Sequence, residues 1–291
     1  MISYPMAVLS AVLAAVFYAL NAPLSKWLLG AVPPTMMAAL LYLGAGAGMA
    51  AVRLVQRRTG KTPHEAPLTR RDLPYTVAMV VLDIAAPIFL MIGLTRTTAA
   101  NASLLNNFEI VATALIARLV FGEAISRRLW GAIVLVTVSS IVLTVEDSSS
   151  FSFSVGSVFV LLACTCWGLE NNCTRSISDK DPLQIVVIKG FGSGAGSLVI
   201  ALAQGERLPA PGPAAGALLL GFVAYGLSIF FYIYAQRGLG AAKTSAYYAL
   251  APFLGAGLSL LIFREIPGPT FLMALLLMAA GTWLASTEQT A

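Results

Sequence analysis

Charged residues are scarce in this chain: they make up 11% of its 291 residues, whereas 58% are hydrophobic and the mean hydropathy is +0.84. A soluble globular protein carries about 25% charged residues, so this chain lacks the polar surface needed to face water on all sides. The composition therefore excludes a soluble enzyme and a secreted disulfide scaffold. It also excludes a nucleic-acid-binding protein, because the net charge of +5 is spread over short loops instead of forming one basic patch.

Histidine and cysteine are rare too, and this limits the available chemistry. The single histidine lies in a polar loop, so neither a multi-histidine metal site nor a Ser–His or Cys–His pair can form within the apolar stretches of the chain. Cys164, Cys166 and Cys173 lack the paired spacing of zinc or redox sites, and we interpret them as packing residues. We therefore expect no enzymatic activity, no catalytic residue, no cofactor and no bound metal.

Long apolar stretches dominate the rest of the sequence. A transmembrane helix needs about 20 mostly apolar residues, and short polar or proline-rich segments divide the chain into ten such stretches. The predicted spans cover residues 4–29, 34–54, 74–95, 97–121, 127–145, 154–174, 182–203, 214–236, 240–263 and 268–285. The first stretch has no basic segment before it, so we interpret it as a membrane span and not as a removable signal. The expected fold class is all-α integral membrane, with ten transmembrane helices in a lipid bilayer.

Orientation follows from the distribution of lysine and arginine, which favour cytoplasmic loops. With the N-terminus inside, twelve of these residues fall in inner loops and four in outer loops or at outer span ends. The inner set is Arg53, Arg57, Arg58, Lys61, Arg70, Arg71, Arg127, Arg128, Arg175, Lys180, Arg237 and Lys243. The outer set is Lys26, Arg96, Arg207 and Arg264. Both termini are therefore predicted to be cytoplasmic.

The two halves of the chain resemble each other. Residues 18–26 (YALNAPLSK) align with 167–175 (WGLENNCTR), and residues 99–103 (AANAS) align with 241–245 (AAKTS). Several matches in the same order, each at the same place within its span, indicate an internal repeat.

Each half, 1–147 and 148–291, contains five predicted spans. Because five is odd, the second half must enter the membrane inverted relative to the first. Inverted repeats are typical of secondary transporters, whose substrate site lies near the midplane between the halves.

Particular motifs resemble a known family. The second half contains WGLENN and ALAPFLGAGLSLLIFRE, and the fourth span of the first half ends in LVFGE. With these motifs and the repeat, the whole chain resembles the EamA-type branch of the drug/metabolite transporter superfamily. The resemblance implies an inner (plasma) membrane transporter of bacterial type that exports small metabolites, prominently amino acids, including aromatic ones. The first half departs from the pattern, with Glu109-Ile110 where the repeat has Ala251-Pro252.

Two acidic residues are predicted to lie near the bilayer midplane, where a charge is costly and therefore a functional candidate. Asp83 lies in the third span and Glu109 in the fourth, and a hairpin of these spans would bring both into one pocket. Neighbouring carboxyl groups resist double ionisation, so such a pocket could bind a proton or a cation. The alternative is that each carboxyl group is held by a polar neighbour as a packing device.

Glu170 and Lys189 form a second candidate pair, because both lie about 8–10 Å from the same end of their spans. A salt bridge between them could close an inner gate, or it could simply hold two helices together.

Uncharged candidates complete the expected substrate site. Asn101, Asn106 and Asn171 could hold the charged groups of a zwitterion or bond between helices. The aromatic side chains could line a cavity, or could belong to the interfacial belts in which aromatic residues are common. The aromatic candidates are Trp167, Tyr225 and Tyr248.

The expected function is export of amino acids by alternating access. Efflux of lipophilic or quaternary cations is the alternative, with Asp83 and Glu109 as counter-charges. A non-transporting membrane scaffold is a third hypothesis, but it leaves both acids unexplained. Proton coupling and the oligomeric state stay open at this stage.

Overall fold

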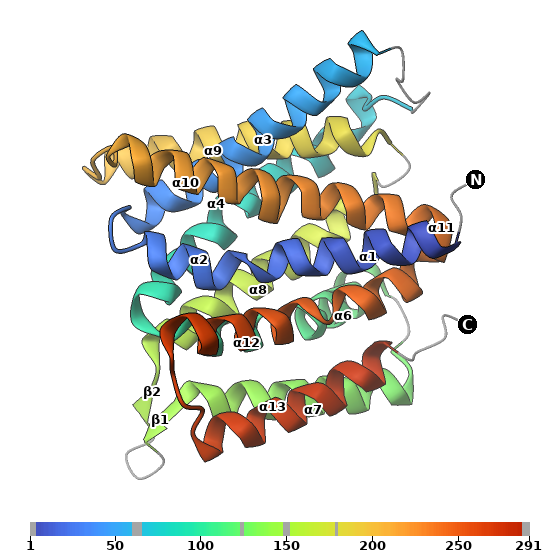
Figure 1. Cartoon of the computed structure of the whole chain (residues 1–291). Coiled ribbons are helices and arrows are strands. Elements are labelled where there is room, and N and C mark those ends of the chain that lie inside the picture. Colours follow the sequence, from blue (N-terminus) through green and yellow to red (C-terminus); the bar gives the residue numbers. More distant parts are fainter. Residues whose placement is uncertain (1–3, 60–65, 123–124, 148–151, 178–179, 287–291) are drawn as a thin grey trace.

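The structure is a computed structural model, and it describes residues 4–59, 66–122, 125–147, 152–177 and 180–286. Glu123 of the LVFGE motif lies outside these residues. The described part is almost entirely helical, with helices lying side by side (Figure 1). In the first half the elements are α1 (Tyr4–Ala19), α2 (Asn21–Leu28), α3 (Pro34–Arg58), η1 (Arg70–Asp72), α4 (Leu73–Arg96), α5 (Ala99–Leu105), α6 (Phe108–Phe121) and α7 (Arg127–Thr144).

A short antiparallel pair of strands, β1 (Val145–Asp147) and β2 (Ser152–Phe153), follows α7. The second half contains α8 (Val155–Arg175), α9 (Pro182–Ala203), α10 (Pro211–Gly221), the π-helix η2 (Phe222–Leu227), α11 (Ser228–Tyr248), α12 (Ala251–Phe263) and α13 (Pro269–Ser286). α1 begins and α13 ends at the same end of the bundle (Figure 1).

Seven helical segments of the described chain are long and apolar enough to cross a bilayer. They are Tyr4–Leu28, Pro34–Arg58, Arg70–Arg96, Ala99–Val120, Arg127–Thr144, Pro182–Ala203 and Pro211–Ala235. Ten had been expected. α8 has 21 residues but carries several polar side chains in its last turns, and α12 and α13 are shorter apolar helices. Helical backbone also continues through residues 237–240, where the sequence predicted a boundary between two spans.

Local sequence sets where many helices begin and end. Proline occupies the first turn of α3, α9 and α10, where its missing N–H costs no helical hydrogen bond. The side chains of Thr98, Ser126 and Ser154 accept hydrogen bonds from the first turns of α5, α7 and α8. Gly122 ends α6 with a left-handed conformation (φ 69°), which glycine adopts without strain.

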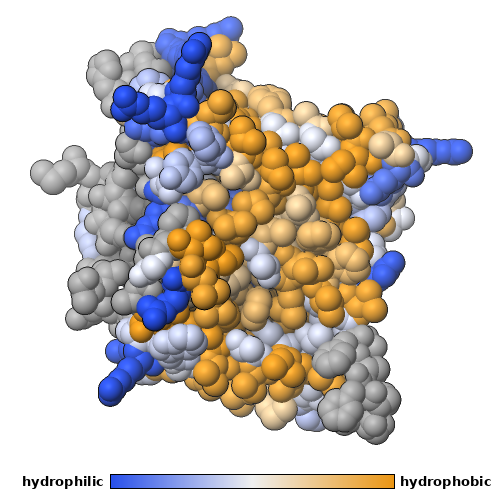
Figure 2. Space-filling view, turned by 180° about the vertical axis from the view of Figure 1, so that it is seen from behind, coloured by the Kyte–Doolittle hydropathy of each residue, from blue (hydrophilic) through white to orange (hydrophobic). Residues whose placement is uncertain are grey.

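Large apolar side chains cover the outer surface. Leu119, Val199, Leu261 and Leu276 each expose more than two thirds of their surface, at 81%, 67%, 76% and 72%. Figure 2 shows this surface as a broad hydrophobic band between two more hydrophilic margins. A monomeric soluble protein seldom exposes such a continuous apolar area, so the band is suited to contact with lipid.

Helices from the two halves pack against each other in matching pairs. α3 packs on α9, and α7 on α13. α4 packs on α8, as α1 does on α11, and α6 packs on α8, as α1 does on α12. Exchanging α1 with α8, α3 with α9, α4 with α11, α6 with α12 and α7 with α13 leaves this set of contacts unchanged.

Glycine permits the closest of these contacts. At the crossing of α3 and α9, a Cβ atom added to Gly190 would lie 2.3 Å from the backbone nitrogen of Gly46. The two backbones therefore touch, as is common between membrane helices with small residues at their interface.

Candidate functional site

In the described part of the chain, three helices are interrupted inside the bundle. α1 gives way to α2 at Leu20, and Pro23 lies in the first turn of α2. α5 gives way to α6 at Asn106 and Asn107, where the Asn107 amide donates a hydrogen bond to the Leu104 carbonyl (3.2 Å). Asparagine favours such breaks because its side chain competes for backbone hydrogen bonds.

The third interruption separates α11 from α12 at Ala249 and Leu250. Pro252 occupies the first turn of α12, where it cannot extend the hydrogen bonding of the preceding helix. This break corresponds to the one between α5 and α6, since Glu109 of α6 aligns with Ala251 of α12 in the repeat. The breaks of the two halves thus lie within one residue of the same aligned position.

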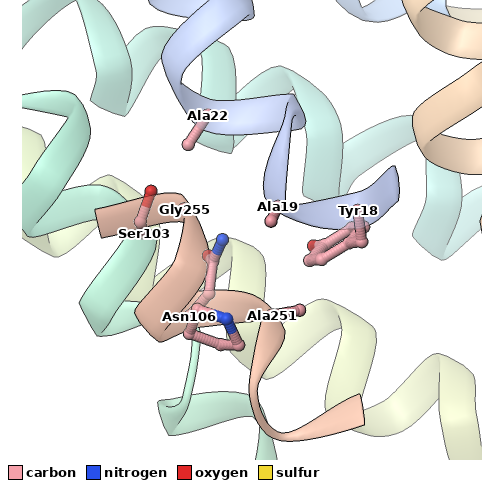
Figure 3. A pocket seen from close by; sticks show the side chains of 8 residues that line it. Tyr18, Ala19, Ala22, Ser103, Asn106, Ala251 and Gly255 are labelled. Atoms are coloured by element: carbon pink, nitrogen blue, oxygen red, sulfur yellow. The ribbon is translucent and has the colours of Figure 1, made fainter. Parts of the chain in front are cut away.

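A small cavity lies where the three interruptions meet (Figure 3). Its walls are formed by Tyr18, Ala19, Ala22, Ser103, Asn106, Ala251, Pro252 and Gly255. A volume of about 10 Å³ leaves room for about one water molecule, which is far less than an amino acid needs. Interrupted backbone at membrane depth is tolerated where it is buried in protein or lines a cavity, and transporters often bind substrate at such breaks.

The polar groups of the cavity are uncharged. Ser103 is 2% exposed, and its hydroxyl has no hydrogen-bond partner in the described structure. Asn106 is also buried, and Figure 3 shows its amide among the lining side chains, with the Tyr18 ring nearby. The site therefore offers hydroxyl and amide groups together with an aromatic surface.

A chain of tyrosine rings extends from the cavity. The Tyr18 ring centre lies 5.7 Å from that of Tyr248 and 6.2 Å from that of Tyr225. Tyr225, in the π-helix η2, is in turn 5.0 Å from Tyr42 of α3. The Tyr42 hydroxyl then donates a hydrogen bond to Asp83 Oδ1 (2.9 Å), which connects the aromatic chain to a charged cluster.

This charged cluster consists of Asp83, Glu170 and Lys189, from α4, α8 and α9. The Lys189 ammonium donates a hydrogen bond to Glu170 Oε1 (2.9 Å) and lies 3.1 Å from Asp83 Oδ2. The geometry toward Asp83 is that of an ion pair and not of a well-directed hydrogen bond. All three residues are buried, so each charge depends on its partners for compensation.

Glu109 has a different partner. Its Oε1 accepts a hydrogen bond from the Asn171 amide of α8 (2.6 Å). Asp83 and Glu109 were expected to share a pocket through a hairpin of the third and fourth spans, and in the structure they have separate partners. The reason is non-local, because α8 from the other half packs against both α4 and α6.

The remaining predicted residues are placed as follows. Asn101 lies in the first turn of α5, and its backbone N–H donates to the Thr98 hydroxyl (3.1 Å). Trp167 is buried in the main hydrophobic core. Neither belongs to the described walls of the cavity, whereas Asn106 does, and Tyr225 and Tyr248 lie along the tyrosine chain.

Several residues of the site were not predicted. Tyr18 and Ser103 line the cavity, Tyr42 binds Asp83, and the Asn21 amide donates to the Tyr225 hydroxyl (3.0 Å). The alignment of the repeats places Asn21 opposite Glu170, and this correspondence could have indicated that Asn21 belongs to the site. Among the described residues, no group of three or more His, Cys, Asp or Glu side chains could hold a metal ion.

The ends of the α3–α9 pair are joined by polar contacts. At one end, Arg53 of α3 forms an ion pair with Asp181 (2.9 Å), whose carboxylate also caps the first turn of α9. At the other end, the Glu206 carboxylate beyond α9 accepts hydrogen bonds from the backbone N–H groups of Thr35 (3.2 Å) and Met36 (2.6 Å) in α3. Each helix is thus held at its N-terminus by a contact with the other.

Comparison with known proteins defines the class. The EamA-like transporter family matches the chain twice, over residues 5–145 and 154–287. An uncharacterized transporter of Methanothermobacter thermautotrophicus is 28% identical over 279 residues, which covers 88% of this chain and 79% of that protein. One protein of known crystal structure superposes with a TM-score of 0.69 over 97% of each chain, and its sequence identity of 18% indicates a shared fold alone.

The chain therefore belongs to the EamA-like transporter family. It is a multi-pass membrane protein and a membrane transporter, with apolar helices suited to a bilayer.

Proposed function

We propose that this transporter exports small polar metabolites, with amino acids, including aromatic ones, as its substrates. It works by alternating access as a secondary transporter in an inner membrane, with ten spans and both termini in the cytoplasm. The observation that carries the proposal is the cavity at the meeting point of three interrupted helices. Such breaks expose backbone groups that a small polar substrate can bind at membrane depth.

The substrate site lies between two inverted halves, residues 1–147 and 148–291. The matching helix contacts of the two halves support this arrangement, because a two-fold axis that relates the halves would produce such pairs. In such an architecture one half rocks against the other and exposes the central site to each side in turn.

The lining of the cavity supports a zwitterionic substrate. Ser103 and Asn106 supply uncharged hydrogen-bonding groups, and the Tyr18 ring supplies an aromatic surface. The adjoining tyrosines Tyr225 and Tyr248 extend this surface, which accounts for aromatic amino acids among the proposed substrates.

The Asp83–Lys189–Glu170 cluster acts as an inner gate in this proposal. It ties α4, α8 and α9 together near the end of the bundle where Arg53 binds Asp181. Opening the site toward that end requires these ion pairs to separate or to move as a unit.

A second candidate function is efflux of lipophilic or quaternary cations. The observation that favours it is an excess of acid: Asp83 and Glu170 share one cation, Lys189, whereas the partly buried Glu109 is bound by the Asn171 amide and has no cation among the described residues. An organic cation would compensate this excess, as would the ammonium group of an amino acid.

Flux measurements on purified protein in liposomes distinguish these functions. The assay compares a labelled panel of amino acids with a quaternary-ammonium dye, and empty liposomes serve as the control. Saturable amino-acid flux without dye flux supports the proposal. Dye flux alone assigns the protein to cation efflux, and flux of neither class contradicts both functions.

A further inference from the structure

The two corresponding helix breaks differ in charge. After the break in the first half, the first turn of α6 carries Glu109. After the break in the second half, the first turn of α12 carries no acidic residue, and the aligned position is Ala251. The two aligned helix starts therefore differ: that of α6 carries a carboxyl group, whereas that of α12, whose Ala251 lines the cavity, carries none.

The start of α12 is open to the cavity. Its N-cap residue, Leu250, provides no side-chain cap, and Ala251 and Pro252 line the cavity wall. The first N–H groups of a helix have no partner within the helix and carry a partial positive charge, which favours an anionic group.

Ser103 supplies an independent sign of a ligand here. It lies on α5 across from α12, and its hydroxyl would be 3.0 Å from a Cβ atom built on Gly255. Although this residue is only 2% exposed, the hydroxyl lacks a partner in the described structure. A buried polar group is normally satisfied, so an unpaired hydroxyl that faces a cavity is available to bind a ligand there.

Glu109 lies one turn along the chain from the cavity residue Asn106. The Glu109 backbone N–H donates to the Asn106 carbonyl (3.1 Å), and the Glu109 side chain accepts from the Asn171 amide. No cationic side chain of the described residues pairs with it, because Lys189 is engaged by Asp83 and Glu170. A partly buried carboxylate without a cation is suited to bind an ammonium group.

We infer that the cavity binds an α-amino acid in one defined orientation. The substrate carboxylate binds the Ser103 hydroxyl and the first turn of α12, and the substrate ammonium binds Glu109. This inference rests on the proposed function and specifies how its substrates are recognised. Because the cavity holds only about one water, the half-helices must separate to admit the substrate.

Competition experiments test which substrate groups are required. Uptake of labelled L-phenylalanine into liposomes is measured with unlabelled L-phenylalanine, L-phenylalaninamide or 3-phenylpropionate as competitor. The amide lacks the carboxylate and the propionate lacks the ammonium. Each should need about a tenfold higher concentration than phenylalanine for equal inhibition, as expected when one hydrogen bond to a charged group is lost.

Two serine variants separate binding from structure. Ser103→Ala should raise the half-saturating phenylalanine concentration about tenfold and leave inhibition by the amide unchanged. Ser197→Ala is the matched control, because the Ser197 hydroxyl is also buried and without a partner in the described structure but lies on α9. It should leave both values unchanged, and thermal unfolding of both variants checks that each is folded.

A third variant reverses the charge at the start of α12. Ala251→Glu places a carboxylate where the substrate carboxylate is expected, so phenylalanine uptake should be lost while L-phenylalaninamide binding is retained. Ala251→Gln has nearly the same size without the charge and should retain more phenylalanine uptake.

The inference is overturned if Ser103→Ala handles phenylalanine as Ser197→Ala does and the amide competes as well as phenylalanine. In that case the proposed function still stands, because the wild type transports amino acids. Absence of flux for every amino acid would instead overturn the proposed function itself, and with it the zwitterionic substrate.

Discussion

The Lys189 ammonium lies 3.1 Å from the Asp83 carboxylate, and both side chains are almost completely buried. Glu170 binds the same ammonium from a third helix, and the Thr174 hydroxyl donates to this Glu170 carboxylate. Three helices, α4, α8 and α9, are therefore joined through one nitrogen atom.

Replacing this lysine should destabilise the protein strongly. Lys189→Met keeps an unbranched side chain one atom shorter but leaves Asp83 and Glu170 buried without a cation, which should cost about 3–5 kcal/mol. Adding Asp83→Asn to Lys189→Met should recover part of the loss, because it removes one of the stranded charges. Thermal unfolding in detergent measures this, with the exposed Arg57→Met as control. A loss no larger than that of Arg57→Met would show that the cluster does not stabilise the fold.

The crossing of α3 and α9 should be sensitive to a single methyl group. In Gly190→Ala the new Cβ would lie 2.3 Å from the Gly46 backbone, so the helices must separate, at a cost of about 1–3 kcal/mol. Gly212→Ala is the matched control, since a Cβ there meets no atom within 4 Å. Unfolding of both variants in detergent gives the comparison, and equal stability of the two would contradict the close contact.

The N-terminus of α3 should loosen without its cap. Glu206→Ala removes the acceptor for the Thr35 and Met36 N–H groups and should lower stability by about 1 kcal/mol. Hydrogen exchange at these two amides should become faster, while Glu206→Gln, which keeps one oxygen acceptor, should have a smaller effect. Arg207→Ala next to it should leave the exchange unchanged. Unaltered exchange in Glu206→Ala would show that the cap is not formed in solution.

The sequence predicted the helical elements well where apolar runs are long. The span predicted over 182–203 coincides with α9, because Pro182 starts it and polar residues follow Ala203. The break within the span predicted over 97–121 was missed, although Asn106-Asn107 was a local signal for it. An apolar run indicates membrane depth but carries little information about an interruption inside it.

Contacts between the halves could not be predicted from local pattern. Glu170 and Lys189 lie on consecutive helices, α8 and α9, so their equal depth was enough to suggest the ion pair that the structure contains. Asp83 and Glu109 are each bound by a side chain of the other half, Lys189 and Asn171, and no pattern within the first half predicts these partners. Tyr42 was missed for a related reason: a tyrosine in an apolar span gives no sign of the acid it will contact.

Glu109 provides the sharpest test of substrate charge. Glu109→Gln keeps an oxygen that can accept from Asn171, so the fold should be retained while the negative charge is lost. The half-saturating phenylalanine concentration should rise about tenfold, and inhibition by 3-phenylpropionate should be unchanged, because that compound has no ammonium group. Measuring uptake at several pH values also shows whether Glu109 carries a proton, since uptake by the variant would then lose its pH dependence.

The control for this test is Glu265→Gln, because Glu265 lies beyond the far end of α12 from the cavity. If the quaternary-ammonium dye is transported by the wild type and lost in Glu109→Gln at every pH, then Glu109 binds cations in general and the protein belongs to the efflux class. If Glu109→Gln and Glu265→Gln behave alike with phenylalanine, the carboxylate does not bind the ammonium. Glu109 would then serve only to hold α6 against Asn171 of α8.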